Sequence, residues 1–352
     1  MSKWKGDRLS IEIYGQSHAK CVGAKVCNFP KIKVDFERLE KFMARRRGNP
    51  KFAWSTPRIE GDVPTFSAIS DGVLQGDFTI EIANNNVKSK DYSELFAKPR
   101  PSHADYVRYL LDGTCDFSGG GEYSARLTAP FAVVGALAKQ YLEDNYGIKV
   151  LAYLSSVGNV LGKSYKDSQI TDKEIESMGV FPALSNGEKM VEEIKSRAFE
   201  GDSVGGVVQC IVFNPLSKLG GNLFGGLEGK ISTLLYAIPG VKGVEFGEGF
   251  DISKGYGSTE NDQLFVERGK VKFKTNKAGG INGGVSNGEP ITMSVAFRPT
   301  PSIFKEQNTV DLQKMENTVI KIKGRHDSCI AVRGVPVVES AVAIAILDSI
   351  KE

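Results

Sequence analysis

The chain contains only three histidines, and each lies in a short polar or glycine-containing stretch. The stretches are YGQSHAK around His18, RPSHADY around His103 and GRHDSC around His326. Imidazole gives or takes a proton near neutral pH more readily than other side chains. The placement therefore indicates proton transfer, although local hydrogen bonding alone would also explain each histidine. No HxxxH or HxH pair is present, so the histidines do not form a metal-ligand pattern.

Arginines gather in the predicted loops and turns. ARRRGNPK (44–51) holds three in succession, and others are Arg100, Arg126, Arg325 and Arg333. Guanidinium groups bind phosphate and carboxylate through paired hydrogen bonds. The net charge of +3 is too small to indicate nucleic acid as the main partner. The pattern predicts a local anion pocket, although 44–51 taken alone could equally be a solvated helix end.

Glycines cluster in FSGGGEYSAR (117–126) and AGGINGGVSNG (278–288). Either stretch could present backbone N–H groups to a bound phosphate or flavin, or could simply form a tight turn. Neither contains the GxGxxG dinucleotide pattern. GGLEGKIS (225–232) resembles a P-loop, but Phe224 replaces the first glycine and Ile231 the serine or threonine, which excludes an NTPase.

The composition is that of a globular protein with a sizeable core. Of 352 residues, 41% are apolar and 25% are charged. The five cysteines are odd in number and lack CxxC spacing, which favours a reducing compartment over a zinc site or disulfide framework. The N-terminus lacks the apolar stretch of a signal peptide, and we expect no segment to approach the roughly 20 apolar residues of a membrane span. We therefore expect a soluble cytoplasmic protein.

The elements that must position these residues follow from the apolar pattern. Segments 129–142 and 335–347 are apolar on nearly all sides, which predicts helices buried between layers. Alternation predicts strands at 10–15, 205–213, 243–250 and 291–299, and 173–204 predicts surface helices flanking a turn. Runs of strands with grouped helices favour an α+β fold over a βαβ series. Length alone allows one or two domains.

Nine motifs, in order over nearly the full length, resemble those of chorismate synthases. They are YGQSHAK, RRRGNPK, RPSHADY, FSGGGEYSARLTA, GDSVGGVV, YAIPGVKGVEFGEGF, NKAGGINGGVSNGEPI, FRPTPSI and GRHDSC. The resemblance implies one domain over residues 1–352, with a helical layer sandwiched between antiparallel β-sheets, in a homotetramer. It implies a lyase that converts 5-enolpyruvylshikimate 3-phosphate to chorismate by anti-1,4-elimination of phosphate, requires reduced FMN and serves aromatic amino acid biosynthesis.

The resemblance also implies roles for particular residues. His18 is the expected general acid for the departing phosphate, with Ser17 beside it. His103 is expected at the pyrimidine edge of the flavin and Asp327 at flavin N5, and Ser124 completes the catalytic set. The implied FMN contacts are Glu122, Tyr123, Ser124, Pro239, Gly240, Gly283, Arg298, Pro299, Thr300, Pro301, Ser302 and Arg325. The implied substrate contacts are Arg46, Arg47, Arg100, Arg126 and Arg333. Arg46 and Lys51 match positions linked to NADPH in members that reduce their own flavin.

Some residues depart from the family pattern inside the site motifs. Gln16 and Ala19 stand where the family has GESHG, Glu122 replaces a usual arginine, Pro239 an amide residue and Arg298 a lysine. These changes leave open a divergent paralogue that binds FMN or a shikimate-type anion without full catalysis. A purely structural role for the apolar helices is a weaker alternative, because the three histidines and Asp327 are retained.

Overall fold

The computed structural model describes residues 2–17, 19–49, 52, 61–84, 96–117, 119–322 and 326–351. Its helices are α1 (Phe36–Arg46), α2 (Asp105–Asp112), α3 (Thr128–Tyr146), α4 (Asp172–Glu176), α5 (Gly187–Phe199), α6 (Leu227–Tyr236), α7 (Gly257–Glu260) and α8 (Ile330–Ser349). Short 3-10 turns at η2 (Gly121–Tyr123) and η3 (Ala125–Leu127) precede α3.

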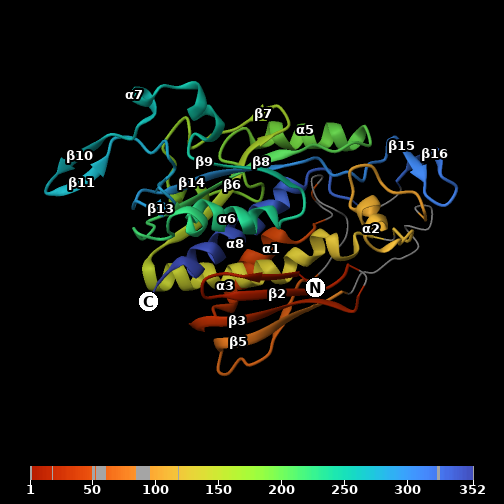
Figure 1. Ribbon diagram of the computed structural model, residues 1–352, viewed down its shortest axis with the longest axis horizontal. Helices are drawn as coiled ribbons and strands as arrows, with labels where there is room; N and C mark the ends of the chain where they lie inside the picture. The colour runs from red at the N-terminus through yellow and green to blue at the C-terminus, as the bar shows by residue number, and fades with distance from the viewer. Residues whose placement is uncertain are drawn as a thin grey trace.

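Two antiparallel sheets enclose a layer of helices (Figure 1). The first sheet has the order β1 (Ser2–Lys5), β2 (Ser10–Gly15), β3 (Cys21–Lys33), β5 (Val73–Ala83), β4 (Pro64–Phe66). The second has the order β7 (Val160–Leu161), β6 (Lys149–Val157), β8 (Gly206–Phe213), β14 (Ile291–Phe297), β9 (Val241–Phe246). Three hairpins lie outside them: β10 (Leu264–Glu267) with β11 (Lys270–Phe273), β12 (Ile281–Asn282) with β13 (Val285–Ser286), and β15 (Glu306–Asp311) with β16 (Glu316–Lys321). The predicted α+β sandwich is confirmed.

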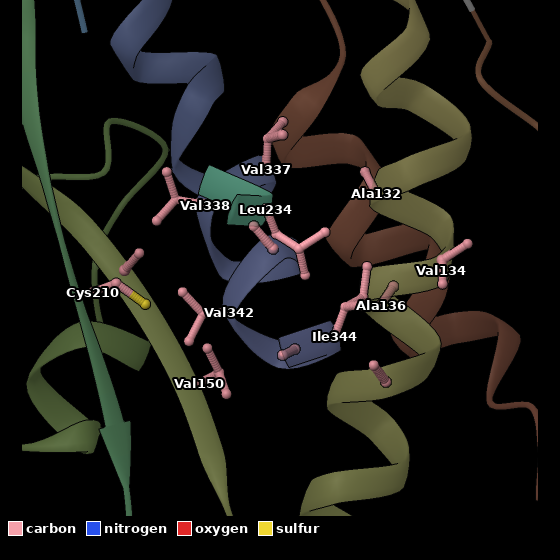
Figure 2. Close-up of a cluster of buried hydrophobic side chains, with 14 of the residues drawn as sticks. Ala132, Val134, Ala136, Val150, Cys210, Leu234, Val337, Val338, Val342 and Ile344 are labelled. Carbon is pink, nitrogen blue, oxygen red and sulfur yellow. The ribbon is translucent and has the colours of Figure 1, made fainter. Parts of the chain in front are cut away.

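The two predicted buried helices form the centre of the helical layer. Helix α3 packs on β3 and β5 of the first sheet, and α8 packs on β6 and β8 of the second. Where α3 and α8 meet, a Cβ added to Gly135 would lie 2.1 Å from the Ser340 Cβ, so only glycine permits this backbone approach. Figure 2 shows Val342 of α8 beside Val150 and Cys210 of the second sheet. Apolarity on all sides is thus explained by burial on all sides.

Helix α8 corrects one expectation from the sequence. It is 20 residues long, five more at its N-terminal end than the predicted apolar segment, and its mean hydropathy of 1.9 suffices in length and composition to cross a membrane. However, 89% of that window is buried inside the protein, as in the core helix of a globular fold.

The predicted strands are confirmed at β2, β8 and β14, but the prediction for 243–250 was half wrong. Strand β9 ends at Phe246, and the chain then enters the 3-10 turn Gly249–Lys254. The predicted surface helices are α4 and α5, joined by a turn. Residues 247–250 continue the alternating apolar pattern that predicted a strand, but Gly247 has a φ of 55° and ends the extended backbone.

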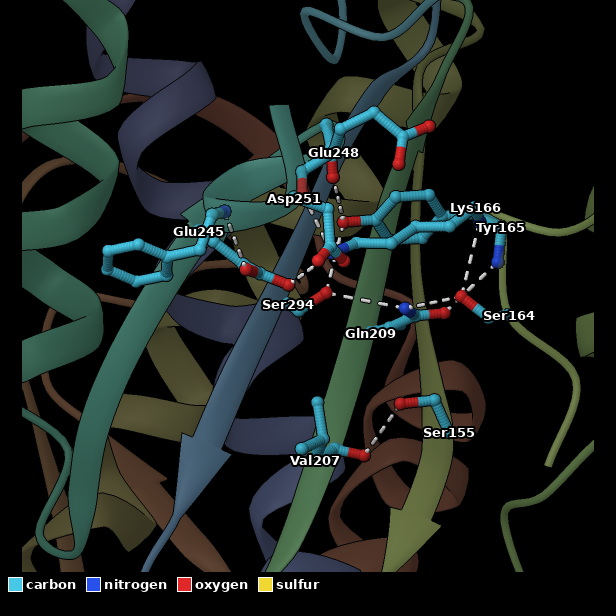
Figure 3. A network of polar contacts seen from close by, with 12 residues as sticks. Ser155, Ser164, Tyr165, Lys166, Val207, Gln209, Glu245, Glu248, Asp251 and Ser294 are labelled. Atoms are coloured by element: carbon cyan, nitrogen blue, oxygen red, sulfur yellow. Dashed lines mark hydrogen bonds and ion pairs between the residues drawn. The ribbon is translucent and has the colours of Figure 1, made fainter. Parts of the chain in front are cut away.

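A polar network covers part of the second sheet's other face (Figure 3). Gln209 of β8 accepts from the Tyr153 hydroxyl at 2.6 Å and donates to Ser164 at 2.9 Å. The Tyr165 hydroxyl lies 3.0 Å from Ser294 of β14. The loop after β7 is therefore fastened across β6, β8 and β14 by these hydrogen bonds. Tyr165 and Ile170 of the same loop also join an apolar cluster with Tyr153 and Ile211 of the sheet.

A buried charge cluster joins the helices to the second sheet. The Glu339 carboxylate of α8 is fully buried and accepts from Arg45 of α1 at 2.7 Å, from Lys139 of α3 and from the Ala152 backbone N–H at 3.0 Å. Burial opposes ionisation of Glu339, but the charges of Arg45 and Lys139 outweigh it and hold its pKa below the ordinary value. One carboxylate therefore ties α1, α3, α8 and β6 together.

We predict that Glu339→Gln lowers the free energy of unfolding by about 3 kcal/mol, because the buried Lys139 ammonium loses its counter-charge. Urea denaturation followed by circular dichroism measures this change. Glu37→Gln is the matched control, since Glu37 pairs with Lys41 on the exposed face of α1 and should change stability little. Equal effects of the two substitutions would contradict the prediction.

Candidate active site

Three of the five expected substrate arginines, Arg46, Arg126 and Arg333, come together where three helix ends meet. Arg46 ends α1, Arg126 lies in η3 just before α3, and Arg333 lies in the first turn of α8. The Arg46 and Arg126 side chains are buried, with exposed fractions of 3% and 6%. Buried guanidinium groups require counter-charges or acceptors. No sequence motif near these arginines indicates where such a counter-charge lies.

The counter-charge is Asp62, a residue that the sequence analysis did not identify. Its buried carboxylate accepts from Arg46 Nη1 at 2.7 Å through Oδ2 and from Arg126 Nη1 through Oδ1. Burial favours the neutral form of Asp62, but the charges of Arg46, Arg126 and Arg333 prevail and lower its pKa. Thr128 accepts further bonds from Arg46 at 3.2 and 3.1 Å. The cluster is held rigid before any ligand binds.

Arg333 connects this cluster to Asp327. Its Nε donates to the Arg46 carbonyl oxygen at 2.8 Å, and its Nη1 donates to Asp327 Oδ2 at 2.8 Å. The Asp327 carbonyl in turn accepts from the Thr300 hydroxyl at 2.9 Å. Three segments distant in the sequence are thereby fixed relative to one another.

A second ionic group surrounds His103. Arg100 Nε and Nη2 donate to the fully buried Asp105 carboxylate at 2.7 and 2.8 Å, and Arg100 Nη2 also donates to the Gly119 carbonyl at 2.8 Å. His103 Nδ1 lies 2.7 Å from Asp105 Oδ1, which assigns the proton to Nδ1 and leaves Nε2 as an acceptor. Burial lowers the pKa of His103, with Arg100 and Arg298 adding to the effect against Asp105. His103 is therefore neutral near pH 7.

His326 directly precedes Asp327 in the segment before α8. Burial is the first cause that lowers its pKa, to about 4; the charge of Arg100 adds to the effect and that of Asp327 opposes it. His103 and Asp327, two of the three predicted proton-transfer residues, belong to the two ionic groups described above.

The third predicted proton-transfer residue, His18, lies outside the described residues, as do Arg325 and Lys51. The neighbours of His18 are described. Asn84 Nδ2 donates to the carbonyls of Gln16 and Ala19 at 3.1 and 2.8 Å, and Asn84 Oδ1 accepts from Arg126 Nε at 2.8 Å. Both flanks of His18 are therefore tied, through one amide side chain, to the arginine cluster.

Several expected flavin segments also adjoin. The Arg298 N–H donates to the Gly240 carbonyl at 3.0 Å, and a Cβ on Gly240, whose φ is 95°, would lie 2.5 Å from Ile330 at the start of α8. Ser203 donates to the Thr300 carbonyl at 2.7 Å. Pro239 and Gly240 thus meet the segment Arg298, Pro299, Thr300, Pro301 and Ser302 beside Asp327.

Three other expected flavin contacts, Gly283, Glu122 and Tyr123, lie in other elements of the structure. Gly283 lies in the β12–β13 hairpin, where the Gly284 carbonyl accepts from the N–H of Leu227 at the first residue of α6. Pro239 follows the far end of that ten-residue helix, so Gly283 and Pro239 adjoin opposite ends of α6. Glu122 and Tyr123 are exposed in η2. Ser124 Oγ accepts from the Arg126 N–H at 3.2 Å and keeps its own proton to donate.

Two cavities border these groups. One of about 640 Å³ is lined by Arg100, His103 and Tyr106 together with the β15–β16 hairpin. The other, of about 510 Å³, is lined by Arg47 and Arg333 among apolar residues of α4 and α8. Arg47, just past the end of α1, donates to Glu40 at 2.7 Å, and the carboxylates of Glu40 and Asp62 raise its pKa. Within the described ranges, no group of His, Cys, Asp and Glu could hold a metal ion.

Comparison with known proteins gives a consistent result. The sequence model of the chorismate synthase family matches residues 9–350. Chorismate synthases of Thermococcus kodakarensis and Pyrococcus abyssi are each 41% identical over 98% of this chain and 96% of their own length. That of Methanocaldococcus jannaschii is 39% identical over 97% of this chain and 94% of its length. A crystal structure of a chorismate synthase shares the fold, with a TM-score of 0.74 at 22% identity over 98% of this chain and 92% of that one.

The family match and these relatives define an enzyme of the carbon–oxygen lyase class. The chain belongs to the chorismate synthase family.

We predict that Asp62→Asn lowers the free energy of unfolding by about 3 kcal/mol at neutral pH, because two buried arginines lose a shared counter-charge. The folded-state pKa of Asp62 is depressed, so its contribution is present above the ordinary carboxylate pKa and is lost as the pH falls through the folded value. The difference between the wild type and the variant should therefore shrink in acid.

Chemical denaturation at a series of pH values measures this difference. Asp71→Asn makes the same chemical change at an exposed residue that also has a positive φ, and should be nearly silent. A pH-independent difference would contradict the assignment of Asp62 as the counter-charge.

Proposed function

We propose that this chain is an active chorismate synthase that eliminates phosphate from 5-enolpyruvylshikimate 3-phosphate in the presence of reduced FMN. One observation carries the proposal: Arg333 bridges the buried arginine cluster and Asp327. Cations suited to the substrate and the residues suited to proton transfer thereby belong to one continuous site.

The substrate carries two carboxylates and a phosphate, which require several cations. Arg46, Arg126 and Arg333 supply three positive charges against the carboxylates of Asp62 and Asp327. Arg47 and Arg100 add two more at the neighbouring cavities. In a site shielded from water, fixed cations stabilise anions and a leaving phosphate far more than they do in solution.

The described residues fit a flavin. The Ser17 hydroxyl and His326 Nε2 are buried without a hydrogen-bond partner among the described residues, and such groups normally have one. His103, Asp327, Gly240 and the segment 298–302 would hold FMN, with Ser124 at its edge. When bound, reduced FMN supplies an electron-rich ring that promotes loss of phosphate without net oxidation or reduction.

Side chains of the protein would carry out the proton transfers. His18, whose flanks are tied to Arg126 through Asn84, would protonate the departing phosphate. His103 would hold the protonation state of the pyrimidine edge through its Nε2 lone pair. Asp327, oriented by Arg333, would receive or return the proton at flavin N5. Residues 1–352 would act as one domain.

Further properties belong to the same proposal. We place the protein in the cytoplasm as a homotetramer with a small-molecule substrate, without a nucleic-acid or membrane partner. The NADPH positions that the resemblance implies are Arg46 and Lys51, but Arg46 is also assigned to the substrate, so NADPH would need other contacts while the substrate is bound. No observation favours a paralogue that binds without catalysis: the side chain of Glu122 is exposed, and its charge reversal leaves the Asp62 cluster intact.

We predict that the purified protein with reduced FMN under strict anaerobiosis releases phosphate from 5-enolpyruvylshikimate 3-phosphate. His18→Ala and Asp327→Asn should each lower kcat about 10²- to 10⁴-fold, the usual contribution of a positioned acid or base. Lys189→Ala on the exposed face of α5 is the control. Flavin binding without any phosphate release would support the paralogue instead.

A separate prediction concerns the flavin reductant. If Arg46 holds the substrate as proposed, it cannot also hold NADPH, so NADPH alone should not sustain turnover with oxidised FMN, whereas dithionite-reduced FMN should. NADPH oxidation followed at 340 nm, together with phosphate release, distinguishes the two. Sustained turnover with NADPH alone would show that the protein reduces its own flavin.

A further inference from the structure

His326 has a position that the mechanism above does not use. It precedes Asp327 directly in the chain. Asp327 already has Arg333 as a partner, and His103 already has Asp105. His326 therefore adjoins a proposed site residue whose own partner is fixed.

The Nε2 atom of His326 is shielded from solvent and lacks a hydrogen-bond partner in the described part of the chain. A buried polar group that stays unpaired is unfavourable, so the unpaired nitrogen points to a partner supplied by a ligand. The low pKa of this histidine, caused first by burial and then by Arg100, keeps the ring uncharged at neutral pH. A neutral imidazole has one N–H and one lone pair, and it adds no charge.

These properties of His326 suit the flavin better than the anionic substrate. Carboxylates and phosphate are met by the cations Arg46, Arg126 and Arg333, where an uncharged ring would contribute little. The pyrimidine ring of a flavin instead presents carbonyl oxygens and ring nitrogens, which pair well with a neutral donor and acceptor. Asp327, which follows His326 directly, and His103 are residues proposed for the flavin.

We propose that His326 contacts the bound flavin and positions it through a hydrogen bond from or to Nε2, next to Asp327. This inference rests on the proposed function, because it requires FMN to bind at all. It assigns to the third histidine a role in cofactor recognition rather than in proton transfer to the substrate.

FMN affinity and the stability of the ligand-free protein, measured together, test the proposal. His326→Leu should weaken FMN binding about tenfold or more in a fluorescence titration, because the variant loses the hydrogen bond that positions the flavin. His326→Gln, which keeps a donor and an acceptor, should restore most of the affinity. The Tm of ligand-free His326→Leu should be unchanged or higher, because an unpaired buried nitrogen is removed.

Cys329→Ala is the matched control, since it reduces packing in the same segment without removing a hydrogen-bonding group of the site. Unchanged FMN affinity in His326→Leu would overturn the inference. A fall in Tm with an equal loss of affinity in His326→Gln would also overturn it, because that result indicates a structural role. Failure of the wild type to bind FMN would instead refute the proposed function.

A second readout avoids any doubt about folding of the variants. Because the chain has only three histidines, selective ¹⁵N-histidine labelling of the wild type yields three imidazole spin systems. Addition of FMN should shift the Nε2 resonance of His326, identified by its absence in His326→Gln. An Nε2 resonance that stays unchanged at saturating FMN would contradict the contact.

Discussion

The site depends on the guanidinium of Arg333, which binds the Arg46 carbonyl and the Asp327 carboxylate at the same time. Without this bridge, the end of α1 and the segment before α8 would have no direct polar link among the described contacts. Arginine can make it because its planar fork presents several donors at fixed angles. The bridge sets the distance between the cations that would hold the substrate and the carboxylate proposed for flavin N5.

The fold provides what such a site requires. Helices α3 and α8 approach closely enough at Gly135 and Ser340 to bring their N-terminal ends to one place. Glu339 fastens α1, α3 and β6 to α8 deeper in the same layer. The cost of burying so many charges is reduced because each carboxylate serves two cations, as Asp62 and Glu339 both do.

Much of the fold could be predicted from the sequence because burial leaves a local pattern. All-round apolarity identified α3 and α8, and alternation identified β2, β8 and β14. His103, Asp327 and the arginines were proposed for the site from their chemical type and their motifs; their roles stay predictions, and the structure gives them ionic partners. Asp62 and Asn84 could not be found this way, since they lie 16 and 42 residues from Arg46 and Arg126 respectively and belong to no motif. Counter-charges of this kind are selected by the folded geometry, and a sequence pattern does not report them. The separation of Gly283 from Pro239 likewise follows from the length of α6, not from either motif.

A crystal structure of the protein with FMN and 5-enolpyruvylshikimate 3-phosphate tests the account most directly. We expect the flavin ring between His103 and Asp327, with the substrate's anionic groups against Arg46, Arg126 and Arg333 and the Arg333–Asp327 contact retained. A flavin bound away from Asp327, or a substrate that leaves those arginines untouched, would contradict it.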